Sequence, residues 1–203
     1  VANTLNGFAA CARGDAGVLA ALREATLGQP LDAWNTQEVA TSLQALAVLR
    51  VDDDEWVSYL CRAALGHPPS SYLPPEAAML AWACAALSVG SQQMLRLVVE
   101  ALDTCITGMD RNSLRQVHQF FLSCRHDPTL SRAAPAGWGL LEGLEGAKCR
   151  AAFEPLPGEL RASSLQRDVA DTLTAMGATF EEEAVEPVTG YSLDMLVGEG
   201  GEG

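Results

Sequence analysis

An apolar segment recurs along this chain with a spacing of 37 to 38 residues. VANTLNGFAA, which starts at Val1, aligns with VATSLQALAV at Val39, AAMLAWACAA at Ala77 and LRQVHQFFLS at Leu114. The apolar residues of the first two segments occupy positions 1, 5, 8 and 9, which lie on one face of an α-helix. Units of this kind bury their apolar faces only against their neighbours. The sequence therefore predicts a stack of helices.

A second series of apolar segments follows the first at the same spacing. It consists of VLAALREA from Val18, WVSYLCRA from Trp56 and MLRLVVEA from Met94, so each repeat is a pair of helices. The fourth second helix is expected in AGWGLLEGLEGAKCRAAF from Ala136, where each glycine costs roughly 1 kcal/mol of helix stability relative to alanine. We predict an all-α fold, with an α-solenoid of about four helix pairs over residues 1–150 and a linker over 151–162.

The pattern changes in residues 163–197. Ser163 and Gln166 have the spacing of a capping box, and the helix that they begin ends at Gly177, a natural residue for the position after a helix. One apolar stripe runs along this helix, through Leu165, Val169, Leu173 and Met176. The following ATFEEEAVEP and YSLDMLV predict two short strands joined by a turn. Residues 198–203, rich in glycine, predict a flexible tail.

Charge and cysteine usage limit the classes of partner. Thirteen basic and 26 acidic residues give a net charge of -13, which opposes nonspecific attraction to a polyanion. The six cysteines include no CxxC pair, so they predict core thiols in a reducing compartment rather than a zinc site. No apolar run of 18 residues predicts a membrane span. Val1 lies inside a predicted helix without an initiator Met, so we expect an upstream part, including any targeting peptide, outside this sequence.

Motifs for catalysis and cofactor binding are missing from the sequence. It has no GxSxG and no GxxxxGK[ST], and its one GxGxxG, GEGGEG from Gly198, has no helix to follow it. His67, His118 and His126 have no acidic or cysteine partner at the spacing of a metal site. We therefore predict a protein that is not an enzyme, with no catalytic residues, no metal and no cofactor.

The segment from Ser163 resembles the start of the RAP domain, through SSLQRDVADTL, the glycine-ended turn, the acidic strand and GYSLD from Gly190 to Asp194. The repeats of 37 to 38 residues look like the octotricopeptide and FASTK-type arrays that precede RAP domains in organelle proteins. The resemblance implies that residues 163–197 begin a RAP-like domain in which Gly190, Tyr191 and Asp194 carry the motif. It also implies a mitochondrial or plastid protein that binds organellar mRNA or rRNA.

RAP domains are similar in fold to PD-(D/E)xK nucleases, and Asp194 would be the first acidic residue of that motif. A metal-dependent nuclease needs further carboxylates and a lysine to hold the ion and orient the attacking water. The only lysine is Lys148, and no E-x-K strand follows Asp194. Because this strand is missing after Asp194, we expect this segment to bind RNA rather than to act as a nuclease.

Arginines are the predicted RNA contacts, because a guanidinium binds phosphate with two parallel hydrogen bonds. The candidates are Arg111, Arg115, Arg125, Arg132, Arg161 and Arg167. The alternative is that these are ordinary solvated positions with acidic partners. Residues at equivalent repeat positions share no pattern, as Asn3, Thr41, Met79 and Gln116 show, so a code of one base per repeat is not expected.

Two functions follow from these observations. The first is a non-catalytic organellar RNA-binding repeat protein that acts in RNA processing or stability, translation or ribosome assembly. The second is a structural protein–protein scaffold, such as a lineage-specific subunit of an organellar ribosome or another large complex. The net charge of -13 favours the second, and the resemblance favours the first.

Overall fold

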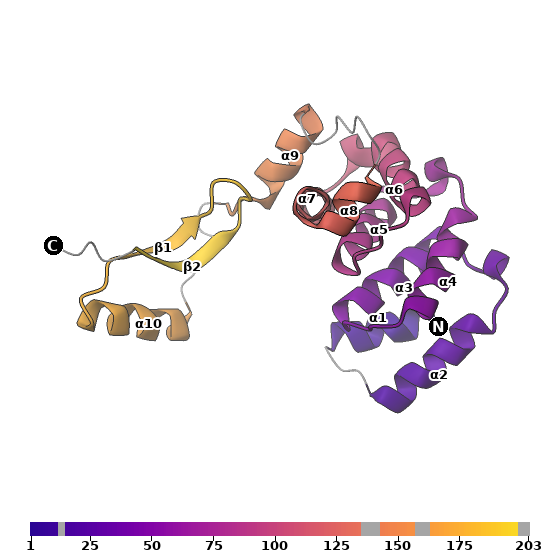
Figure 1. Ribbon diagram of the computed structural model, residues 1–203, viewed down its shortest axis with the longest axis horizontal. Helices are drawn as coiled ribbons and strands as arrows, with labels where there is room; N and C mark the ends of the chain where they lie inside the picture. Colours follow the sequence, from indigo (N-terminus) through magenta and orange to yellow (C-terminus); the bar gives the residue numbers. More distant parts are fainter. Residues whose placement is uncertain (12–14, 135–142, 157–162, 199–203) are drawn as a thin grey trace. The chain divides into compact units, whose positions relative to one another are not determined.

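The chain is mostly helical and ends in a two-stranded antiparallel hairpin (Figure 1). The computed structural model describes residues 1–11, 15–134, 143–156 and 163–198. Contacts divide the chain into two compact units, Val1–Cys149 and Arg150–Gly203. The predicted helical character of the chain and the predicted hairpin are therefore confirmed.

The first helices of the predicted pairs form a row in the first unit. They are α1 (Ala2–Ala10), α3 (Thr36–Val48), α5 (Pro74–Ala86) and α7 (Arg111–His126). α3 packs between α1 and α5, and α5 packs between α3 and α7 (Figure 1). The row is held by side chains that are almost completely buried, among them Leu43, Leu46, Leu80 and Phe120. Each first helix thus covers apolar surface of the next.

The second helices form a parallel series. They are α2 (Ala16–Leu27), α4 (Asp54–Leu65) and α6 (Gln92–Cys105), and they begin 38 residues apart. α4 contacts both α2 and α6, while α3 packs against α4 and α5 against α6. Trp56, Leu60, Met94 and Val98 are buried on these helices, as their apolar spacing predicts.

Side-chain caps explain where the helices begin. Asp15, Asp53 and Ser91 each accept a hydrogen bond from a backbone N–H in the first turn of α2, α4 or α6. α3 begins with a capping box: Asn35 Oδ1 accepts from the Glu38 N–H at 2.8 Å, and Glu38 Oε2 accepts from the Asn35 N–H at 3.1 Å. The capping residues recur with the same spacing as the helices. The local sequence and the repeat therefore indicate the same helix starts.

Short 3₁₀ turns connect one pair to the next. They are η1 (Leu31–Ala33), η2 (Pro69–Ser71) and η3 (Ile106–Gly108). Each is followed by a large buried side chain, Trp34 at 3%, Tyr72 at 3% and Met109 at 9% exposure. The Tyr72 hydroxyl donates to the Ala64 carbonyl at 2.9 Å, which ties the connector back to α4. The segment from Gly66 therefore contains an ordered turn.

α3 and α5 end in the same way, with a left-handed residue that is not glycine. Arg50 has φ of 53° and Ser88 has φ of 49°. In each case the next N–H reaches back into the helix: Val51 to the Leu46 carbonyl at 3.0 Å, and Val89 to the Cys84 carbonyl at 2.9 Å. The two helix ends are 38 residues apart. The left-handed backbone conformation therefore repeats, although the residue that adopts it differs.

The fourth pair departs from the prediction. α8 (Pro128–Ala133) stands at the position of a second helix and has six residues. It begins early because Asp127 caps it and Pro128 occupies its first position. The start of the predicted helix at Ala136 lies outside the described residues, which omit 135–142, and the later part of that helix forms α9 (Leu144–Phe153).

The second unit holds α10 and the hairpin. α10 (Ser164–Ala175) begins with the predicted capping box of Ser163 and Gln166, and Gly177 follows it with φ of 72°. β1 (Phe180–Val185) pairs with β2 (Ser192–Val197) in antiparallel register, with Phe180 opposite Val197 and Val185 opposite Ser192. The apolar stripe of α10 is largely exposed, with Leu165 at 70% and Met176 at 74%.

Some predicted segment boundaries fall at the edges of the described residues. α9 continues to Phe153, so the first three residues of the expected linker are helical, and residues 157–162 lie outside the described chain. In the expected tail, the Gly198 N–H donates to the Thr179 carbonyl at 3.0 Å, and residues 199–203 lie outside the described chain.

Candidate nucleic-acid interface

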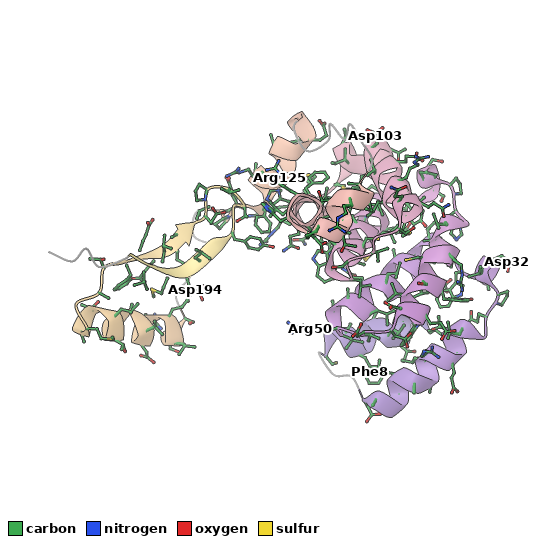
Figure 2. All side chains as sticks on the ribbon, viewed as in Figure 1. Phe8, Asp32, Arg50, Asp103, Arg125 and Asp194 are labelled. Carbon is green, nitrogen blue, oxygen red and sulfur yellow. The ribbon has the colours of Figure 1, made fainter. Side chains whose placement is uncertain are left out.

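Four of the candidate arginines lie on two helices that pack together, α7 and α8. Arg115 and Arg125 on α7 and Arg132 on α8 are exposed, and Arg111 is half-buried (Arg125 is labelled in Figure 2). Within the described residues, none of the three exposed arginines forms an ion pair. Their guanidinium groups are therefore available to an anion from solution.

The aspartates near these arginines are engaged as helix caps. Residues 110 to 134 include four arginines and two aspartates, in a chain of net charge -13. Asp110 Oδ1 accepts from the Ser113 N–H at 2.8 Å, and this bond is the main cause of the lowered pKa of Asp110. Asp127 caps α8 through the N–H groups of Thr129 and Leu130. This end of the unit is thus locally basic.

The start of α8 is positioned by the loop after α5. The Ser88 hydroxyl donates to Asp127 Oδ2 at 2.9 Å and is the largest cause of the lowered pKa of Asp127. Gly90 lies so close to α8 that an added Cβ would come within 2.7 Å of Thr129 Cγ2. These contacts therefore fix the position of the first turn of α8, the short helix that carries Arg132.

A groove between α4 and α6 contains two arginines that the sequence analysis did not select. It comprises two hollows of about 490 and 340 Å³ that share Leu65 and Gln93. Arg96 lines the larger hollow, and Arg62 lines the smaller one and lies over the Tyr59 ring, 5.9 Å from its centroid. Arg62 and Arg96 do not occupy equivalent repeat positions, so the repeat gave no signal for them. Their places in the groove follow only from how α4 and α6 pack.

The acidic run at the start of α4 has the opposite character. Asp53 Oδ2 accepts from Arg23 Nε at 2.6 Å, and Glu55 also pairs with Arg23. The Trp56 N–H is the main cause of the lowered pKa of Asp53. Arg23 is thus occupied by carboxylates, as the alternative interpretation of the arginines expects, and this surface repels phosphate.

The remaining candidates belong to the second unit or lie outside the described residues. Arg167 is exposed on α10, and Arg161 lies outside the described chain. Gly190 has φ of 78° in the hairpin turn, and Tyr191 packs edge-to-face on Phe153 with ring centroids 4.9 Å apart. Asp194 is exposed on β2 (Figure 2). Gly190 and Tyr191 thus have structural roles in the hairpin.

Groups that could hold a metal do not gather in the described part of the chain. No cluster of three or more His, Cys, Asp or Glu side chains suits a metal ion there. His67 Nε2 lies 2.8 Å from the Trp34 carbonyl, which holds the connector. Burial raises the pKa of the Cys61 thiol to about 12 and that of Cys149 to about 11, so neither is a ready nucleophile.

No family model, no curated protein and no solved structure matches the chain. In the residues that the structure describes, none of the helices has the length and apolar character needed to cross a bilayer. The resemblance to RAP proteins and the organellar location remain predictions.

Proposed function

We propose that this chain is a non-catalytic RNA-binding α-solenoid, with a phosphate-docking surface formed by the arginines of α7 and α8. The observation that carries the proposal is the exposure of Arg115, Arg125 and Arg132 without an acidic partner among the described residues. Unpaired guanidinium groups bind phosphate without first giving up an ion pair. The resemblance extends the proposal to organellar RNA processing or stability, translation or ribosome assembly.

The packing of the helix pairs supports the solenoid. α1, α3, α5 and α7 contact one another in sequence order, and α2, α4 and α6 do the same. A stack of this kind presents a continuous surface to an extended partner. Arg115 and Arg125 are separated by roughly 15 Å along α7, since a helix rises about 1.5 Å per residue. One extended strand can contact both.

Local charge decides where RNA can approach. The chain as a whole has a net charge of -13, so RNA is repelled from most of its surface. Fields beyond about 10 Å are screened at moderate salt, so the α7 and α8 arginines act on phosphate with little opposition from distant carboxylates. Binding is therefore confined to this end of the first unit.

The proposal is tested with the complete 203-residue chain and a labelled single-stranded RNA, followed by fluorescence anisotropy. Arg115→Gln, Arg125→Gln and Arg132→Gln are combined in one variant. The matched control combines Arg50→Gln, Arg62→Gln and Arg96→Gln, which removes the same charge from exposed arginines elsewhere in the unit.

The α7 and α8 variant should bind RNA at least roughly tenfold more weakly, because three phosphate contacts are lost. The control should change the affinity little. Equal losses in the two variants would mean that RNA responds to overall charge, and a larger loss in the control would place the site at Arg50 or in the groove between α4 and α6. Either result contradicts the proposed surface.

The second candidate is a protein–protein scaffold. It is favoured by the acidic surface and by the exposed apolar side chains of the second unit, including Leu165, Met176 and Val188. Such side chains mark surfaces that other proteins cover. The complete chain would then fail to bind RNA even at low salt, which separates this candidate from the first.

A further inference from the structure

The outward face of α1 is a hollow apolar surface at one end of the row of first helices. It encloses about 390 Å³ and is lined by Asn3, Thr4, Gly7, Phe8 and Cys11. Thr4, Gly7 and Cys11 are exposed, and the Phe8 ring is half-buried (labelled in Figure 2). A phenyl ring and a thiol are thus presented to solvent by a helix that, in the described part of the chain, packs mainly against α3 on its other side.

The repeat identifies the residues equivalent to this face in the other first helices. Phe8 corresponds to Leu46 on α3, Cys84 on α5 and Phe121 on α7, whose exposures are 0%, 1% and 3%. Gly7 corresponds to three further residues that are at most 1% exposed, namely Ala45, Ala83 and Phe120. The same face is therefore buried three times and uncovered once.

The difference follows from the neighbours. α3, α5 and α7 each pack against the first helix that precedes them in the chain. α1 packs against α3, and its buried residues are Ala2, Leu5 and Ala9. These match Ala40, Leu43 and Ala47 on α3, and hence belong to the face that each first helix turns to the next. Thr4, Gly7 and Cys11 lie on the opposite face of α1, with Phe8 at its edge, and this is the face that a preceding helix would cover.

Gly7 supports this interpretation independently. It lies inside α1, where glycine lowers helix stability relative to alanine, and a Cβ added to it would meet nothing within 4 Å. No packing described in the structure requires a glycine there. A missing side chain lets a neighbouring helix approach the backbone closely.

α2 shows the same incomplete cover. Ala25 is exposed, whereas its equivalents on α4 and α6, Ala63 and Ala101, have exposures of 1% and 0%. Leu22 is half-buried, whereas the equivalent Leu60 is 0% exposed. Within the described residues, both helices of the first pair thus have exposed positions that are buried in the later pairs, so the partner that fits is a pair of helices.

We propose that this end surface is the docking site for a further helix pair of the same array. Its first helix presents small apolar side chains like Ala40, Leu43 and Ala47 to Phe8 and Gly7. A second copy of the chain does not offer this face. On α7 the equivalent positions are Arg115, His118 and Leu122, and burial of an arginine against Phe8 would leave its charge without a partner.

The test lengthens the chain by one repeat in register. A copy of residues 35–76 is joined ahead of Val1, so that Glu76 of the copy is followed by Val1, as Glu76 is followed by Ala77 in the chain. The readout is the rate at which the Cys11 thiol reacts with an alkylating reagent, measured by peptide mapping. Cys11 should react at least tenfold more slowly in the lengthened chain. An unchanged rate overturns the proposal.

Two controls separate docking from a general gain in stability. Ala40→Glu with Ala47→Glu in the added copy places carboxylates on the docking face and should restore the rapid reaction of Cys11. Phe8→Ala should lower the melting temperature of the lengthened chain more than that of the 203-residue chain. Equal effects of Phe8→Ala in both chains also contradict the proposal.

The second part of the test uses the protein isolated from its own cells. Peptide mapping should find residues covalently ahead of Val1, and Cys11 should be protected before denaturation. If Cys11 of the isolated protein is alkylated as fast as Cys11 of the 203-residue chain, the proposal is overturned. Cys11 of the 203-residue chain could instead become protected as the concentration of the chain rises, with a dimer seen in sedimentation. That result would overturn the proposal and indicate self-association.

Discussion

The Ser88 hydroxyl donates a hydrogen bond to the Asp127 carboxylate across 2.9 Å, although the two residues are 39 positions apart in the chain. The other carboxylate oxygen of Asp127 accepts from the N–H groups of Thr129 and Leu130 at 2.6 and 3.3 Å. One side chain thus joins the end of α5 to the start of α8. It fixes the helix that carries Arg132.

Stability at acidic pH should depend on Asp127. Its pKa is lowered by the Ser88 hydroxyl first and then by the backbone of Thr129, so the folded state binds a proton less readily than the unfolded state. A lowered pKa contributes stability above the unfolded value, and this contribution is lost as pH falls through the folded value. The urea midpoint of the wild type should therefore fall more steeply below about pH 4 than that of Asp127→Asn.

The matched control is Asp32→Asn, which changes an exposed carboxylate on η1. Its urea midpoint should follow the wild type from pH 6 to pH 3. If Asp127→Asn followed the wild type as closely, the hydrogen bonds to Asp127 would carry no net stability.

Glycine at position 50 should stabilise the first unit. Arg50 is exposed and has φ of 53°, a conformation that glycine adopts without strain. We expect Arg50→Gly to raise the unfolding free energy by about 1 kcal/mol, measured by urea titration. Ser88→Gly relieves the same strain at φ of 49° but loses the bond to Asp127, so its gain should be smaller. Arg62→Gly, inside α4, should instead destabilise by about 1 kcal/mol.

The contact between Tyr191 and Phe153 should hold the hairpin turn against α9. The rings meet edge-to-face with centroids 4.9 Å apart, a geometry that contributes about 1 kcal/mol beyond burial. Tyr191→Ala should speed amide exchange across β2, and Tyr191→Phe should leave it slow. Val188→Ala removes an exposed side chain from the same turn and serves as the control. Equal exchange in Tyr191→Ala and wild type would contradict a structural role for Tyr191.

Much of the fold could be predicted because periodicity and caps act locally. Ser163 was sufficient to place a helix start, and Gly177 a helix end, since both residues act within one turn of the helix. The left-handed ends at Arg50 and Ser88 could not be predicted, because no glycine marks them. α8 was missed because a six-residue helix shows no apolar period.

The candidate site was predictable only in part. Residue type selected Arg115, Arg125 and Arg132, but their lack of acidic partners depends on how helices pack. The sequence equally could not show that Arg23 is paired with Asp53, or that Arg62 and Arg96 line a groove. Arg167 belongs to the second unit, which the sequence did not separate from the α7 and α8 arginines.

The dependence of RNA affinity on salt tests the central claim most directly. Each phosphate contact to a single strand contributes about -0.7 to the slope of log K against log salt concentration. We predict a steep negative slope for the complete chain, and a slope less negative by about 2 when Arg115, Arg125 and Arg132 are all replaced by glutamine. An unchanged slope in that variant, or no binding by the complete chain at low salt, would contradict RNA docking on α7 and α8.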